Sequence, residues 1–187
     1  HYVRPGSALD AEARKRGNSV YLPDRVVPML PEALSNDLCS LRPNEPRAAM
    51  VAIITMDENG DVTSHSFERA LIRSAARLTY DKVQAWHEGG MTAGELELDE
   101  AILTNLFSAW DALGRARAAR EPLALNLKER RVMLDDDGSP AAIVQRAQSE
   151  SQRLIEDYMI AANVAAAEAL IKVQRPCVFR VHDKPDP

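Results

Sequence analysis

The stretch RAAMVAIITMDENGDVTSHSFERALIRSA, residues 47–75, decides the fold class of this chain. It holds two strand-like runs on either side of Asn59 and Gly60. An Asn-Gly pair between such runs is a strong hairpin signal, because both residues tolerate the positive φ angles that a tight turn requires. We therefore expect two paired antiparallel strands here.

Helical patterns lie on both sides of this hairpin. Ser7 and Thr79 are suited to cap helices at their first residue, and glycines follow at the expected stops, at Gly17 and at Gly89. The last long pattern places apolar residues at helical spacing. We expect helices over about residues 8–16, 79–86, 98–120 and 148–173, and a helical turn at 31–36.

Three further segments favour extended structure. Residues 19–22 form a short extended run, residues 130–134 and 141–145 flank the polar turn DDDGSP, and residues 177–181 form a last strand-like run. Strand pairs followed by helices indicate an α+β fold, with a mixed or antiparallel sheet core and surrounding helices. We expect residues 1–187 to be a single segment of one domain.

Composition limits the classes of function. The chain has 187 residues, of which 45% are hydrophobic and 27% charged, with a formal net charge of -5. This charge argues against binding nucleic acid by bulk electrostatics, so any RNA or DNA contact has to be local. The two cysteines are far apart and lack CxxC spacing, which argues against a disulfide framework or a zinc site. No apolar run approaches the roughly 20 residues that span a bilayer, and a cytoplasmic protein is expected.

Both ends of the sequence have the character of internal positions. The first residues, His1 to Pro5, lead directly into a turn without an initiator Met, and the chain closes just after a strand-like run. We interpret the chain as truncated at both ends.

Two candidate sites have simpler interpretations. The run Asp135–Gly138 could suggest a calcium loop, but it lacks the alternating ligands and the closing Glu, so a polar hairpin tip is favoured. Cys39 could be a nucleophile, yet its apolar neighbours favour a small buried hydrophobic residue.

Two other features leave alternatives open. Glu156 and Asp157 are adjacent on an expected helix and point about 100° apart, so one could face inward; a charged surface with Arg153 as partner to Glu156 is the alternative. Tyr21 lies in a short extended run between Arg16 and Arg25. A core residue and a platform on which a nucleobase stacks are equally compatible with that pattern.

Four strings, in order, carry a resemblance to a known family. They are HYVRPGSALDAEARKRGNSVYLPDRVVPMLPEALSNDLCSL at 1–41, SAARLTY at 74–80, LIEDYMIAANVAAAEAL at 154–170 and FRVHDKP at 179–185. Together they resemble the RNB-type catalytic domain of the ribonuclease II and ribonuclease R family of 3′→5′ exoribonucleases. The resemblance covers nearly the whole chain.

The resemblance implies processive hydrolysis of single-stranded RNA from its 3′ end to nucleoside 5′-monophosphates, with Mg²⁺ as cofactor. It places the metal-binding aspartates upstream of His1, so no catalytic residue and no metal ligand is expected in this segment. The segment alone is expected to be inactive, and the intact enzyme to be monomeric.

The resemblance also assigns residues to the RNA. Tyr21 matches a tyrosine that stacks on the RNA near its 3′ end, with Arg16 and Arg25 as possible phosphate contacts. Tyr80 matches a second tyrosine near the RNA channel. Glu156 matches a carboxylate close to the bound 3′ nucleotides, where it could accept a hydrogen bond from a ribose hydroxyl.

One position departs from the family pattern. Leu125 stands where relatives often have a phenylalanine opposite the stacking tyrosine. An aliphatic side chain can still pack against a base, but it gives up half of an aromatic sandwich, and stacking is worth about 1–3 kcal/mol per base. The length of the end product is therefore open.

Two competing hypotheses remain. The chain could belong to a catalytically inactive RNB homologue that binds RNA or protein, or it could be an acidic structural domain that meets partners through its long helices. The segment before His1 distinguishes the first from the enzyme, because closely spaced aspartates there favour hydrolysis. The second does not explain the four ordered strings.

Overall fold

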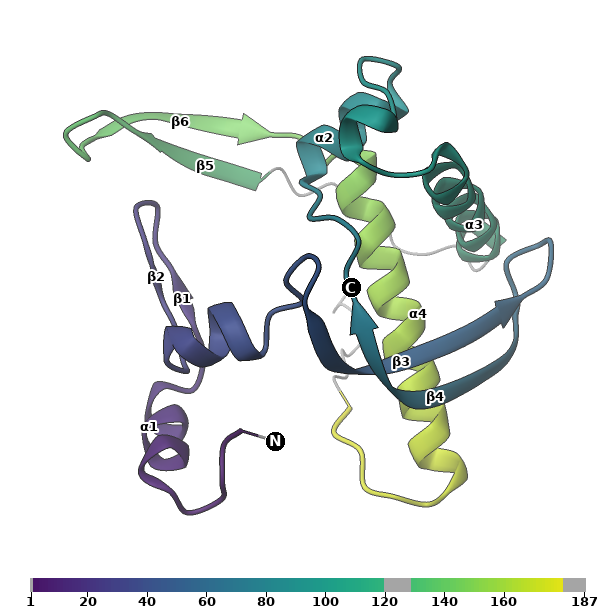
Figure 1. The fold of residues 1–187 in the computed structure, drawn as a ribbon, viewed down its shortest axis with the longest axis horizontal. Coiled ribbons are helices and arrows are strands. Elements are labelled where there is room, and N and C mark those ends of the chain that lie inside the picture. The colour runs from purple at the N-terminus through teal and green to yellow at the C-terminus, as the bar shows by residue number, and fades with distance from the viewer. Residues whose placement is uncertain (1, 120–128, 180–187) are drawn as a thin grey trace, which may run out of the picture. The chain divides into compact units, whose positions relative to one another are not determined.

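The computed structural model describes residues 2–119 and 129–179 (Figure 1). Helices and strands follow one another in the order α1 Ala8–Arg16, β1 Val20–Tyr21, β2 Val26–Val27, η1 Ala33–Leu38, β3 Pro46–Met56, β4 Val62–Arg73, α2 Tyr80–His87, η2 Gly94–Leu96, α3 Glu100–Ala119, β5 Glu129–Leu134, β6 Pro140–Arg146 and α4 Glu150–Lys172. Here η1 is a π-helix and η2 a 3₁₀-helix. The α+β class is confirmed, and the strands in these ranges form three separate two-stranded sheets, β1–β2, β3–β4 and β5–β6.

The local signals in the sequence are realised where they were expected. The Ser7 hydroxyl accepts a hydrogen bond from the Asp10 amide at 3.2 Å, and the Thr79 hydroxyl accepts one from the Lys82 amide at 3.4 Å. Each capping side chain satisfies an amide that the first helical turn leaves without a partner. Because the caps and glycine stops act locally, the helices begin and end close to the expected residues.

The Asp57 side chain stabilises the turn of the β3–β4 hairpin. Its Oδ1 accepts hydrogen bonds from the amides of Asn59 at 2.9 Å and of Asp61 at 3.0 Å, and Gly60 takes φ +87°. A carboxylate that binds backbone amides two to four residues later stabilises a tight turn, and glycine accepts positive φ without steric cost. The Asn-Gly signal therefore predicted this hairpin correctly.

Two expectations were wrong. Residues 177–179 are not in a strand, because no strand pairs with them in the part of the chain that is described, and Val178 is fully exposed; residues 180–181 lie outside that part. Cys39 is exposed rather than buried. It lies at the end of η1, where its amide donates to the Leu34 carbonyl at 2.8 Å.

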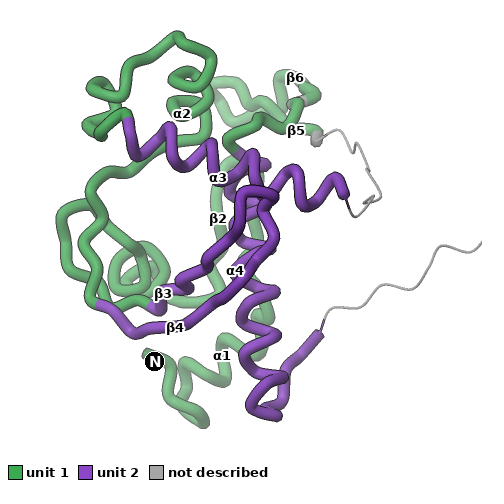
Figure 2. Tube along the Cα trace, turned by 90° about the vertical axis from the view of Figure 1, so that its right-hand side faces the viewer, with its two compact units in different colours: residues 1–49, 71–100, 123–151 green, residues 50–70, 101–122, 152–187 purple. Residues whose placement is uncertain are grey.

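The chain divides into two compact units (Figure 2). Unit 1 comprises residues 1–49, 71–100 and 123–151, and unit 2 comprises residues 50–70, 101–122 and 152–187. In unit 1, Ser151 is buried and bonds to α2: its hydroxyl donates to the Tyr80 carbonyl and its amide donates to Gln84 Oε1, both at 3.0 Å. These bonds fix the segment before residue 152 to the first turns of α2.

Unit 2 contains most of the β3–β4 hairpin, of α3 and of α4. Its most buried side chains are Leu103, Phe107 and Ala112 of α3 with Leu154 and Ala165 of α4. None of the helices in the described ranges is long and apolar enough to cross a membrane.

The tip of the β3–β4 hairpin presses on α3 within unit 2. A Cβ atom on Gly60 would lie 1.9 Å from the Ala112 carbonyl oxygen, so the two backbones are in direct contact. Arg115 Nη2 donates to the Glu58 carbonyl at 2.7 Å, and His65 Nδ1 lies 3.6 Å from Glu168 Oε2 of α4. The hairpin is therefore bound to both helices of the unit.

Candidate nucleic-acid interface

The short β1–β2 hairpin presents Tyr21 to solvent. Val20 pairs with Val27 and Tyr21 with Val26, and the Leu22 amide donates to the Arg25 carbonyl at 2.8 Å to close the turn. Tyr21 is 78% exposed. The core interpretation of Tyr21 is therefore wrong for this chain, and an exposed aromatic ring on a hairpin is what stacking on a base requires.

The base of this hairpin is held by side chains. Arg16 Nη1 donates to the Pro28 carbonyl at 2.9 Å, and the Met29 amide donates to the Ser19 hydroxyl at 3.0 Å. Arg16 Nε also donates to Glu12 Oε1 at 2.8 Å, and this bond lowers the pKa of the Glu12 carboxyl below its usual value. Arg16 thus connects α1 to the base of the β1–β2 hairpin, on which Tyr21 lies.

Arg25 lies in the turn of the same hairpin. Its Nη1 atom is 2.9 Å from Asp24 Oδ2, and its side chain is 68% exposed. Exposed ion pairs of this kind contribute little to stability and separate easily. The guanidinium can therefore leave Asp24 for an incoming phosphate more readily than Arg16 can leave its two partners.

Tyr80 lies at the start of α2, in the same unit as Tyr21. It follows the Thr79 cap and is 45% exposed. Its carbonyl is the group to which Ser151 donates, so the backbone that carries the ring is fixed.

The adjacent carboxylates of α4 differ in environment. Glu156 is exposed, whereas Asp157 is 9% exposed and accepts hydrogen bonds from Trp110 Nε1 at 2.8 Å and from Arg117 Nη1 at 2.5 Å. The inward-facing member is therefore Asp157. Its place in the helix indicates this, because it lies three residues after the buried Leu154 and eight before the buried Ala165.

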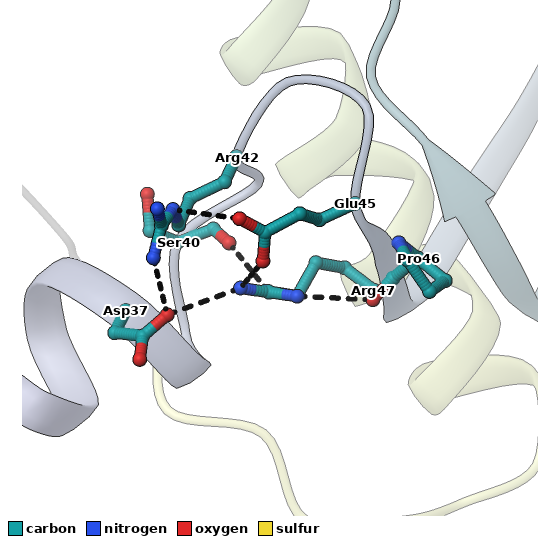
Figure 3. A network of polar contacts seen from close by, with 6 residues as sticks. All are labelled: Asp37, Ser40, Arg42, Glu45, Pro46 and Arg47. Carbon is teal, nitrogen blue, oxygen red and sulfur yellow. Dashed lines mark hydrogen bonds and ion pairs between the residues drawn. The ribbon is translucent and has the colours of Figure 1, made fainter.

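A second arginine cluster, in unit 1, is balanced by its own acidic partners (Figure 3). Asp37 Oδ1 accepts from Arg42 Nη1 at 2.9 Å and from Arg47 Nη2 at 3.1 Å, and Glu45 Oε2 lies 2.7 Å from Arg47 Nη2. Arg47 Nε also donates to the Ser40 carbonyl at 3.0 Å. Two cations and two anions cancel, so this cluster joins η1 to β3 and supplies no excess charge for RNA.

Comparison with known proteins shows the family, since the RNB domain family matches residues 1–187. The chain belongs to the RNB domain family. It is 40% identical over 191 residues to ribonuclease R of Escherichia coli (strain K12), covering 99% of this chain and 23% of that protein. It is 38% identical over 188 residues to ribonuclease R of Thermotoga maritima, covering 100% of this chain and 26% of that protein.

A solved RNB protein has the same fold. The structure of Mycoplasma genitalium RNase R in complex with ribose methylated single-stranded RNA matches with a TM-score of 0.92 and 34% identity, over 99% of this chain and 29% of that chain. The family resemblance seen in the sequence is therefore confirmed. This RNB chain spans about a quarter of the length of the relatives it matches.

The RNB chain brings some of the expected RNA residues together. One hairpin and the helix before it carry Arg16, Tyr21 and Arg25, and Tyr80 belongs to the same unit. Glu156 belongs to unit 2. Sequence reasoning missed Trp110 and Arg117, because their contacts with Asp157 join residues 40 or more positions apart.

Two expectations about the RNB site concern its metal ligands and the residue opposite Tyr21. Within residues 2–119 and 129–179, no three His, Cys, Asp or Glu side chains are grouped so that they could hold a metal ion. Leu125, where an aromatic partner for Tyr21 was expected to be lost, lies outside the described residues.

Proposed function

We propose that this chain is one segment of the catalytic domain of a longer, monomeric, cytoplasmic 3′→5′ exoribonuclease, called the parent enzyme below. The parent enzyme hydrolyses single-stranded RNA processively to nucleoside 5′-monophosphates, and this segment forms part of the wall of its RNA channel. The observation that carries the proposal is the 78% exposed Tyr21 on its braced hairpin, in a chain 40% identical to a ribonuclease R.

Tyr21 stacks on a base near the 3′ end of the RNA. Every nucleobase has a π-face, so stacking holds the strand without reading its sequence, and it contributes about 1–3 kcal/mol per base. Arg25, exposed in the same hairpin, contacts a phosphate. Arg16 adds positive charge at the base of the hairpin, which gives the local attraction that the net charge of -5 does not.

Tyr80 and Glu156 extend the contact along the RNA. Tyr80 offers a half-exposed ring at the fixed start of α2. The exposed Glu156 carboxylate accepts a hydrogen bond from a ribose hydroxyl near the 3′ end. Because deoxyribose lacks the 2′-hydroxyl, this bond favours RNA over DNA.

The Mg²⁺ ligands of the parent enzyme are proposed to lie upstream of His1. When bound, such ions activate the attacking water and stabilise the charge that develops on the phosphate. The residues described here hold and orient the RNA strand so that its terminal phosphodiester reaches that centre.

A 3′-end degradation assay on single-stranded RNA tests the proposal. The parent enzyme is incubated with 5′-labelled RNA in Mg²⁺ and in chelator, and the products are resolved on a denaturing gel and by chromatography of the mononucleotides. Release of nucleoside 5′-monophosphates that stops in chelator supports the exoribonuclease. Binding of RNA without any cleavage would overturn it in favour of an inactive RNB homologue that acts as a binding module.

A further inference from the structure

We infer that Asp157 is a positioning residue, which acts through Trp110 and Arg117 to set the direction in which Glu156 points. This inference rests on the proposed contact between Glu156 and ribose. All four residues belong to unit 2.

The geometry of the Asp157 carboxylate fixes α4 in two directions. Its Oδ2 accepts from Trp110 Nε1 and its Oδ1 accepts from Arg117 Nη1. The two donors are seven residues apart on α3, which places them on one face of that helix and about 10 Å apart along its axis. A carboxylate held from both sides resists rotation of α4 about its axis and sliding along it.

The direction of the Glu156 side chain depends on the rotation of α4 about its axis. Neighbouring residues on a helix point about 100° apart, so burying Asp157 turns the Glu156 side chain outward. Asp157 is 9% exposed and Glu156 is exposed. A rotation of α4 that released Asp157 would move the Glu156 carboxylate away from the ribose by the same angle.

Apolar packing does not fix this part of α4. A cavity of about 210 Å³ lies beside Asp157, and its lining includes Gly60, Leu113, Arg117 and Ala161. Close packing restricts motion only where side chains fill the space, and here they do not. The directional bonds to Asp157 therefore do what packing does three residues earlier at Leu154, which is 1% exposed and does not line this cavity.

Tyr158 provides a matched control on the same two helices. Its hydroxyl donates to the Leu106 carbonyl at 2.8 Å, so it also joins α4 to α3. A Tyr158→Phe variant removes one bond between the helices and leaves the Asp157 carboxylate and both of its donors in place. A change seen with both variants reports on helix docking in general, and a change confined to Asp157 reports on positioning.

The test measures discrimination between sugars by the parent enzyme. Dissociation constants are compared for a single-stranded RNA and for the same strand with 2′-deoxyribose at its 3′-terminal nucleotides. The ratio is the dissociation constant of the deoxyribose strand divided by that of the RNA strand. We expect Asp157→Asn to lower this ratio by about tenfold, the scale of one hydrogen bond to a charged group, and Glu156→Gln to lower it equally. Arg117→Met should follow Asp157→Asn, Arg117→Lys should restore most of the ratio, and the Asp157→Asn, Glu156→Gln double variant should lose no more than either single variant.

Three outcomes would overturn the inference. If Asp157→Asn weakens binding of both strands equally and leaves the ratio unchanged, the residue is merely structural. If Tyr158→Phe lowers the ratio as much as Asp157→Asn, docking of the helices is responsible. If Glu156→Gln itself leaves the ratio unchanged, the proposed contact of Glu156 with ribose fails, and the positioning role fails with it. Should Asp157→Asn not fold, the two Arg117 variants decide between the same outcomes.

Discussion

Replacing Gly60 by alanine should destabilise the β3–β4 hairpin far more than an ordinary turn substitution. Gly60 has φ +87°, and a Cβ atom there would lie 1.9 Å from the Ala112 carbonyl oxygen and 2.9 Å from the Leu113 amide nitrogen. The colliding atoms belong to the backbone of α3, so they cannot move aside by changing a rotamer. The added methyl group has to push the hairpin and α3 apart.

The magnitude follows from two separable costs. Forcing an alanine to positive φ costs about 1 kcal/mol, and overpacking against rigid structure costs about 1–3 kcal/mol more, so a total of roughly 2–4 kcal/mol is expected for Gly60→Ala. Gly138 supplies the control in the β5–β6 turn. It has φ +83°, but a Cβ atom there would meet nothing within 4 Å. Gly138→Ala should therefore cost only about 1 kcal/mol, for the φ angle alone.

Native-state hydrogen exchange is the suitable assay, because it reports the free energy of local opening for each segment separately. Peptides that cover β3, β4 and α3 should lose protection in the Gly60→Ala parent enzyme, and only β5 and β6 should respond to Gly138→Ala. If the two variants lose equal protection, each in its own hairpin, the Gly60 turn does not press on α3 and the reasoning is refuted.

Three further predictions follow from the polar contacts. Arg47→Met should lower the free energy of unfolding by about 2 kcal/mol, because it removes a mostly buried donor from Asp37, Glu45 and the Ser40 carbonyl and leaves one cation, Arg42, against two carboxylates. Arg42→Met, at an exposed side chain, should cost much less, and urea denaturation compares the two variants. Burial raises the pKa of the Tyr158 phenol, so the stability that its neutral form contributes is present below about pH 10 and lost as pH rises through the raised pKa. Melting temperatures from about pH 8 to 11 should therefore fall more steeply in the unmodified protein than in Tyr158→Phe. Parallel curves for the two proteins would contradict this. Arg16→Gln should release one side of the Tyr21 hairpin and change the shortest RNA fragment in the same direction as Tyr21→Ala; an unchanged fragment on a sequencing gel would show that Arg16 does not brace the hairpin.

Features set by neighbouring residues could be predicted from the sequence. Ser7 and Thr79 cap helices as expected, and the hairpin at Asn59-Gly60 forms, because each signal acts within a few positions of itself. The turn at Asp135–Gly138 is likewise a hairpin tip, with the Ser139 amide bound to Asp137 at 2.9 Å.

Features set by distant partners could not be predicted in this way. The extended run at 19–22 was expected, but its pairing with Val26 and Val27 was not. The strand expected at 177–181 failed at 177–179 because a strand needs a neighbour, which the sequence of the run does not supply. Cys39 has apolar neighbours in sequence, yet it is exposed at the end of the π-helix η1.

The same distinction between local and distant contacts applies to the candidate site. Exposure of Tyr21 could not be decided from its sequence context, since a core tyrosine and a stacking tyrosine have similar neighbours; the hairpin geometry decided it. For the carboxylates of α4, helical geometry indicated that one of the two could face inward, but not that it is Asp157, nor that Trp110 and Arg117 bind it. The proposed roles of Tyr21, Tyr80 and Glu156 toward RNA rest on the family resemblance.

The central claim is that Tyr21 holds the RNA near its 3′ end, and the length of the shortest fragment left by the parent enzyme tests it most directly. Tyr21→Ala and Tyr21→Phe are compared with the unmodified enzyme on one labelled single-stranded RNA. We expect Tyr21→Ala to retain hydrolysis but to leave a fragment of different length, and Tyr21→Phe, which keeps the ring, to leave the original fragment. An identical product ladder for Tyr21→Ala would contradict the stacking role and the account built on it.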